Sequence, residues 1–165
     1  MVFLLNEKTI IDEWFDVQLL KSVATQCKEI NFAIIGPSKV RLPNDIGSNV
    51  FFLDRKDYSE IPSYIYHCDM GIIPFKDNDL VKYVSPIKMY EFCSLGKPIV
   101  SISWEELERL DPPIYLAKSQ DDFVYLTKKA CEYVEENKRE ELIKFAQRNT
   151  WESRYNLVME RLKAC

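Results

Sequence analysis

The sequence predicts an α/β domain in which helices cover both faces of a mostly parallel sheet of about six strands. Short apolar runs alternate along the chain with segments whose apolar residues recur at helical spacing. Strands that alternate with helices favour a parallel sheet with right-handed crossovers. The 165 residues, 47% hydrophobic and 29% charged, are typical of a single globular domain. We expect sheet-forming units over residues 1–117 and closing helices over residues 118–165.

The first three strands are predicted from apolar runs. Residues 2–5 form the first run, and a helix follows in which apolar residues from Trp14 to Cys27 recur on one face. A second strand over residues 31–35 ends at a Gly-Pro pair, and a third covers residues 50–53. Continuous apolar runs of this kind are typical of buried parallel strands.

The next unit consists of a short helix and the fourth strand. Ser59 is placed to cap a helix that carries Pro62 in its tolerant first turn. The apolar run over residues 70–73 then predicts the fourth strand.

A polar loop over residues 75–84 connects the fourth strand to the following helix. Ser85 is predicted as the N-cap of that helix, with Pro86 at its first position, and Gly96 is predicted to end it. In parallel sheets ligands bind where strand carboxyl ends and helix N-termini converge. This loop and helix start are therefore the best candidate for a ligand site, and the free N–H groups there suit a phosphate.

The last two strands are predicted over residues 98–102 and 114–117. Ser119 is placed to cap the first of three closing helices, with later boundaries near Asn137 and at residues 149–150.

The charge balance disfavours a nucleic-acid partner. The chain has 22 basic and 26 acidic residues, a formal net charge of -4 and a pI near 5.2, so no basic field would follow a phosphate backbone. We expect an anionic ligand to be held by local contacts instead.

The cysteines and the hydropathy pattern indicate a cytoplasmic protein. An odd number of cysteines without a CxxC pair disfavours both zinc and a disulfide framework, and indicates a reducing compartment; the five are Cys27, Cys68, Cys93, Cys131 and Cys165. No apolar run approaches the roughly 20 residues of a membrane span, and the first residues lack the features of a signal peptide.

The segment from Ser85 to Glu91 carries the most chemistry. Ser85 offers a hydroxyl, and Lys88 lies one helical turn later, where it could neutralise phosphate. Glu91 follows on the same helix and offers a carboxylate to the hydroxyls of a ribose. The alternative is an ordinary Lys–Glu surface pair on a capped helix.

No catalytic residue is predicted with confidence from the residues themselves. His67 is the only histidine, and it precedes the fourth strand, at the amino end of the sheet, where a structural role is favoured. Nor does any Ser or Cys stand in a recognisable nucleophile elbow.

A non-catalytic α/β binding or signalling module is the second interpretation. Asp54 after a strand, together with Lys97, is similar to a phospho-receiver domain. A receiver also needs an acidic pair after its first strand, and this chain has Asn6 and Glu7 there.

Several ordered motifs resemble the carboxyl-terminal domain of GT-B glycosyltransferases, in particular the large retaining family (group 1 type) that uses nucleotide-sugar donors. The resemblance extends over nearly the whole chain; its segments are residues 13–20, 32–37, 49–53, 61–65, 68–75, 85–92, 96–100 and 150–154. It implies one Rossmann-like half of a GT-B fold.

The resemblance also implies a set of binding residues. Ser85, Pro86 and Lys88 would line the donor diphosphate and sugar, and Glu91 would bind the ribose. The turn at Asp54 and Arg55 would border the nucleobase.

The chain departs from the family pattern at two places. Tyr83 stands where the family's paired-glutamate pattern has its first Glu, and residues 9–11 replace the usual Gly-rich turn. These departures predict weaker or altered donor binding, with the phosphate charge resting mainly on Lys88.

The implied activity is sugar transfer from a nucleotide-diphosphate-sugar, such as a UDP-sugar, in cell-surface glycan or polysaccharide synthesis. An amino-terminal acceptor domain, which is absent from the chain, would complete the enzyme, so the chain is expected to bind donor without transferring sugar. No metal or other cofactor is expected, because basic groups and a helix dipole would stabilise the leaving diphosphate. The full-length enzyme would be cytoplasmic or peripheral to the inner face of the membrane. An exposed apolar side of the last helix would favour self-association.

Overall fold

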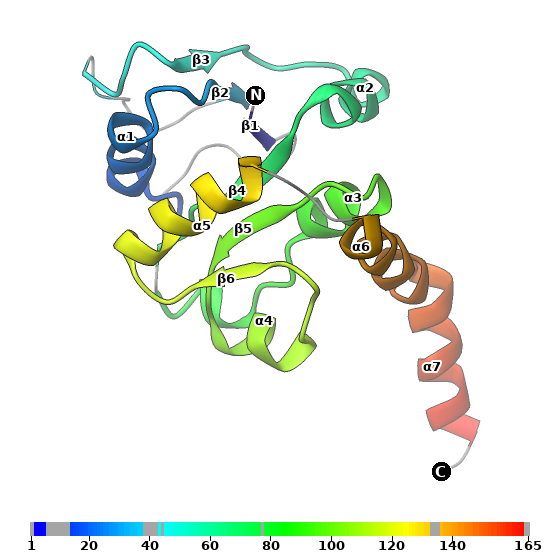
Figure 1. The fold of residues 1–165 in the computed structure, drawn as a ribbon. Helices are drawn as coiled ribbons and strands as arrows, with labels where there is room; N and C mark the ends of the chain where they lie inside the picture. Colours follow the sequence, from blue (N-terminus) through cyan, green and yellow to red (C-terminus); the bar gives the residue numbers. More distant parts are fainter. Residues whose placement is uncertain are drawn as a thin grey trace.

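A computed structural model describes most of the chain, namely residues 2–5, 14–37, 43, 45–76, 78–132 and 136–163. Among these residues it forms a six-stranded sheet of order β3-β2-β1-β4-β5-β6, in which every pairing is parallel (Figure 1). The strands are β1 (Val2–Leu5), β2 (Phe32–Ile35), β3 (Val50–Phe52), β4 (Met70–Ile73), β5 (Ile99–Ile102) and β6 (Tyr115–Ala117). The predicted fold class and strand number are confirmed.

Helices cover both faces of this sheet. They are α1 (Val17–Gln26), α2 (Ile61–His67), α3 (Ile87–Ser94), α4 (Glu105–Leu110), α5 (Gln120–Glu132), α6 (Glu136–Arg148) and α7 (Trp151–Lys163), with 3-10 turns η1 (Tyr58–Glu60) and η2 (Val81–Tyr83).

Two buried clusters, one on each side of the sheet, form the core. On one side the apolar faces of α1 and α5 pack against strand residues such as Phe32, Ile34 and Ile72. On the other side α2, α3 and α6 pack against the alternate residues, such as Ile35 and Ile73. Because successive strand side chains point to opposite faces, strands such as β2 and β4 supply residues to both clusters.

The start of α1 differs from the prediction. Trp14 and Phe15 precede the helix, and Asp16 is its N-cap, with a carboxylate oxygen that accepts a hydrogen bond of 2.9 Å from the Leu19 N–H. Phe15 instead forms an isolated antiparallel bridge with Phe75. The apolar pattern in the sequence therefore starts before the helix does, because Trp14 and Phe15 also lie in apolar surroundings.

The burial predicted for β3 is wrong. This strand lies at the edge of the sheet, and Phe51 and Phe52 are 47% and 39% exposed. An apolar run alone does not distinguish an edge strand from a central one.

Two of the predicted caps are also wrong. Ser59 lies inside η1, whose N-cap is Asp57 in a capping box with Glu60. Ser85 precedes the cap of α3, which is Pro86 itself. Three other predictions are confirmed. Gly96 follows α3 with φ of +64°, the Ser119 hydroxyl caps α5, and residues 149–150 separate α6 from α7.

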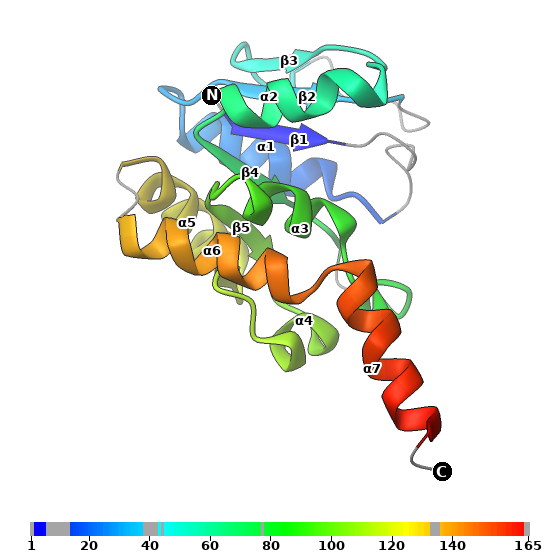
Figure 2. The ribbon, with the colours of Figure 1, turned by 90° about the vertical axis from the view of Figure 1, so that its right-hand side faces the viewer.

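The closing helices differ in how they are buried. Figure 2 shows α6 lying across α3 and α7 extending away from the body. Helix α7 has no buried residue, and its Trp151, Tyr155, Val158 and Leu162 are all more than half exposed. The predicted exposure of this apolar side is confirmed, while self-association through it stays a prediction. Within the described residues, no helix is long and apolar enough to cross a bilayer.

The described cysteines are free thiols, as predicted, and Cys165 lies outside the described residues. Burial raises the pKa of Cys68 and Cys93 to about 12, so both thiols stay protonated at neutral pH.

Asn49 is expected to stabilise the connection between α1 and β2. Its Nδ2 group donates to the carbonyl oxygens of Ala24, Cys27 and Ile30 at 3.1, 3.1 and 2.8 Å. Asn49→Ala would leave these partly buried acceptors without that donor and should lower the free energy of unfolding by about 1–3 kcal/mol. Urea unfolding followed by circular dichroism measures this, with Gln26→Ala as an exposed control. A loss no greater than that of the control would contradict this role.

Candidate functional site

A cavity of about 480 Å³ lies beside α3, where α6 ends and α7 begins. Its walls come from four places in the fold: η1, α3, the end of α6 and the first turn of α7. The lining residues that matter below are Tyr58, Ser85, Tyr90, Glu91, Trp151 and Arg154. The structure therefore brings two predicted site residues, Ser85 and Glu91, to one cavity.

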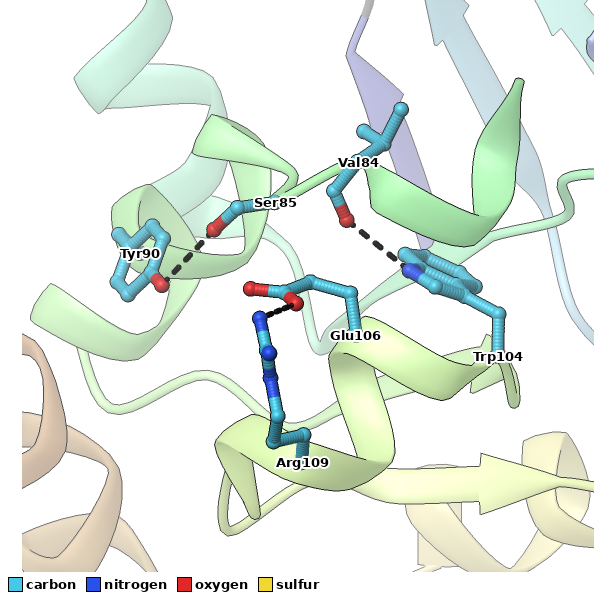
Figure 3. A network of polar contacts seen from close by, with 6 residues as sticks. All are labelled: Val84, Ser85, Tyr90, Trp104, Glu106 and Arg109. Atoms are coloured by element: carbon cyan, nitrogen blue, oxygen red, sulfur yellow. Dashed lines mark hydrogen bonds and ion pairs between the residues drawn. The ribbon is translucent and has the colours of Figure 1, made fainter. Parts of the chain in front are cut away.

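Ser85 is held by a side-chain contact from its own helix. Its Oγ lies 3.1 Å from the Tyr90 hydroxyl (Figure 3). Pro86 is buried and, as the cap, begins α3 with φ of -75°. Ser85 is therefore free of the capping role, and its hydroxyl faces the cavity beside Tyr90.

Glu91 and Lys88 form an ion pair. Lys88 Nζ lies 3.3 Å from Glu91 Oε2, and both side chains are about one-fifth exposed. The alternative interpretation of this spacing, a local Lys–Glu pair, is therefore present in the structure. Glu91 Oε2 is nevertheless buried, and it accepts no hydrogen bond in the structure. A buried carboxylate oxygen that accepts no hydrogen bond is suited to accept one from a hydroxyl or amine group of a ligand.

The cavity lining does not include four of the predicted contacts: Pro86, Lys88, Asp54 and Arg55. Asp54 and Arg55 follow β3 and are exposed; Asp54 has φ of +52°, and its carbonyl accepts from the Gly36 N–H at 3.0 Å. Their role at a nucleobase stays a prediction. Tyr58, next along this segment, is the residue that reaches the cavity.

An aromatic stack supports the loop that enters α3. Phe75 stacks between Trp14 and Trp104, with centroid separations of 5.5 and 5.7 Å. The Trp104 indole N–H also donates to the Val84 carbonyl at 3.0 Å (Figure 3). The backbone of the residue before Ser85 is therefore held by the side chain of Trp104, the N-cap of α4.

Sequence reasoning missed three lining residues, Tyr58, Tyr90 and Arg154. Tyr90 lies within the resembling segment over residues 85–92 without a predicted role, and its hydroxyl accepts from Arg154 Nη2 at 2.6 Å. The resemblance of the last helix included Arg154, yet no local pattern links it to α3.

His67 is exposed, at the end of α2, and its Nδ1–H donates to the Ser63 carbonyl at 2.8 Å. Within the parts of the chain that the structure describes, no three His, Cys, Asp or Glu side chains gather in a metal-binding group. The site therefore consists of hydroxyls, one carboxylate and nearby cations.

Comparison with known proteins bears on this site. No family model matches the chain. It is 28% identical over 144 residues to the "Putative teichuronic acid biosynthesis glycosyltransferase TuaH" of Bacillus subtilis (strain 168), covering 81% of this chain and 35% of that protein.

Solved structures match the fold over 99% of the chain. They include HepE of Anabaena in complex with UDP-glucose, at 15% identity, a TM-score of 0.73 and 49% of that chain. The α,α-trehalose 6-phosphate synthase of Burkholderia multivorans matches at 10% identity, a TM-score of 0.72 and 42% of that chain. This chain therefore spans less than half the length of the proteins it matches.

These matches confirm the predicted resemblance: the chain has the fold of one Rossmann-like half of a GT-B glycosyltransferase.

Proposed function

We propose that this chain is the donor-binding domain of a glycosyltransferase, which transfers a sugar from a nucleotide-diphosphate-sugar to an acceptor. The observation that supports this most is the cavity beside α3, whose lining includes both Ser85 and Glu91. The similarity to TuaH and to structures holding UDP-glucose adds support.

Each group of the donor has a counterpart in this proposal. The Glu91 carboxylate accepts from the ribose hydroxyls, and Ser85 donates to a phosphate oxygen. Lys88, next to Glu91, supplies positive charge for the leaving diphosphate, which is the role a metal ion plays in other enzymes. Pro86 begins the helix whose N-terminus faces the phosphate.

The wider role that we propose is the synthesis of a cell-surface glycan or polysaccharide, in the cytoplasm or at the inner face of the membrane. The similarity to TuaH is what favours it. A further domain would supply the acceptor site, so this chain alone should bind donor without transferring sugar.

Titration with UDP, GDP and ADP by calorimetry tests the proposal. We expect one nucleotide to bind and to stabilise the fold, since a ligand at 100 times its Kd adds about 2.7 kcal/mol to the free energy of unfolding. Incubation of the chain with the matching nucleotide-sugar and a simple sugar acceptor should yield no transfer. If none of the three nucleotides binds, the proposed function is wrong.

A further inference from the structure

Helix α7 reaches the candidate site with two side chains, Trp151 and Arg154. Arg154 Nη2 donates to the Tyr90 hydroxyl at 2.6 Å, and the guanidinium carbon lies 5.1 Å from the centre of the Tyr90 ring. Because α7 has no buried residue, this partly buried contact is a principal tie between its first turn and α3. Arg154 therefore connects an otherwise exposed helix to the cavity wall.

The chemistry of these groups determines which of them donates and which accepts in each hydrogen bond. A guanidinium can only donate, so the Tyr90 oxygen accepts from Arg154. Accepting from a cation strengthens the Tyr90 O–H as a donor, and Ser85 Oγ lies 3.1 Å away to receive it. The Ser85 hydroxyl then keeps its own proton for a different partner, on the side that faces the cavity.

The ring of Tyr90 is itself held in place. It stacks on Phe145 of α6 with a centroid separation of 5.8 Å and an interplanar angle of 3°. The hydroxyl is consequently fixed between Arg154 and Ser85 by two helices, α3 and α6, as well as by its hydrogen bonds.

We propose that Arg154 and Tyr90 are positioning residues that orient the Ser85 hydroxyl as a hydrogen-bond donor to a phosphate oxygen of the bound nucleotide. The identity of the ligand rests on the proposed function, whereas the chain of hydrogen bonds stands on the geometry above. A consequence is that the docking of α7 and the affinity for nucleotide are linked, and this coupling is reciprocal.

A mutant cycle tests the proposal with UDP and with uridine, which lacks the phosphates. Tyr90→Phe keeps the stacked ring and removes the hydroxyl, and Arg154→Gln removes the cation. Each should weaken UDP binding by about three- to tenfold, the effect of one net hydrogen bond, while uridine binding stays unchanged. Arg154→Lys, which retains a donor and the charge, should recover part of the loss. Arg161→Gln, on the exposed part of α7, is the matched control.

The double variant distinguishes positioning from direct contact. If Arg154 acts through Tyr90, adding Arg154→Gln to Tyr90→Phe should weaken UDP binding no further. Neither change should affect UDP binding when it is combined with Ser85→Ala. Additive losses would mean that Arg154 binds the phosphate itself, and equal losses for UDP and uridine would mean general damage to the site. Either result would overturn the proposal.

Hydrogen exchange provides a readout that needs no ligand. Amides in the first turn of α7 should exchange faster in Tyr90→Phe and in Arg154→Gln than in Arg161→Gln. If no nucleotide binds but this pattern appears, the proposed function fails while the connection from α7 to Ser85 stands. If exchange in α7 is the same in all three variants, the connection is wrong. Where UDP does bind, it should slow this exchange in the unmodified chain and not in Tyr90→Phe.

Discussion

Replacing Glu91 with Gln should weaken the binding of UDP by about 10- to 100-fold, because a hydrogen bond to a charged acceptor contributes about 1.5–3 kcal/mol. The Glu91 Oε2 atom accepts no hydrogen bond in the structure and lies 3.3 Å from Lys88 Nζ, so a ribose hydroxyl that pairs with the carboxylate would share it with that ammonium. The amide of Gln is nearly the same size, and the change therefore removes charge rather than volume. Isothermal titration calorimetry measures the effect.

The control for Glu91→Gln is Glu141→Gln, because Lys138 and Glu141 on α6 repeat the same spacing of the ion pair at 3.7 Å. This control should leave UDP binding unchanged. A second comparison identifies the ribose: the unmodified chain should prefer UDP over 2′-deoxy-UDP, and Glu91→Gln should lose that preference. If the variant keeps the preference, Glu91 does not contact the 2′-hydroxyl, and the assignment of this residue is wrong.

Phe123→Ala should lower the free energy of unfolding by about 3–5 kcal/mol, the cost of removing a large aromatic side chain from a packed core. Phe123 on α5 is fully buried in the cluster between the helices α1 and α5 and the sheet. Denaturant unfolding followed by circular dichroism measures the loss. Phe123→Leu leaves a smaller cavity, so its free energy of unfolding should lie between those of the unmodified chain and Phe123→Ala. This variant keeps the measurement possible if the alanine variant does not fold.

The matched control is Tyr125→Ala, two residues along the same helix, where the side chain is 62% exposed. It should change stability by no more than about 0.5 kcal/mol. Equal effects for the two positions would mean that α5 does not fold as one unit with the sheet.

The sheet could be predicted from the sequence because each central strand is a short apolar run, and two of these runs, β2 and β4, are followed directly by Gly36 and Pro74. Helix α4 was missed because only Leu107 of its six residues is buried, and its N-cap, Trp104, gives no side-chain hydrogen bond. A helix with one buried residue has no apolar periodicity to detect.

The candidate site was predicted only in part, for a similar physical reason. Ser85, Lys88 and Glu91 stand within one helix start, where spacing places them on neighbouring turns. Tyr90 and Arg154 are 64 positions apart, and their contact depends on how α6 returns across α3. Local spacing predicts which site residues one helix carries, whereas tertiary packing determines which residues a second helix brings to the same site.

The edge strand β3 has a consequence for handling the protein at high concentration. An unpaired strand edge with exposed phenylalanines is a template for intermolecular strand addition, which leads to aggregation. Here the strand has only three residues, Val50–Phe52, and Asp54 follows with a left-handed backbone that turns the chain away. So short an edge strand offers few main-chain hydrogen bonds to an incoming strand. Short edge strands are one of the ways in which natural sheets avoid intermolecular strand pairing.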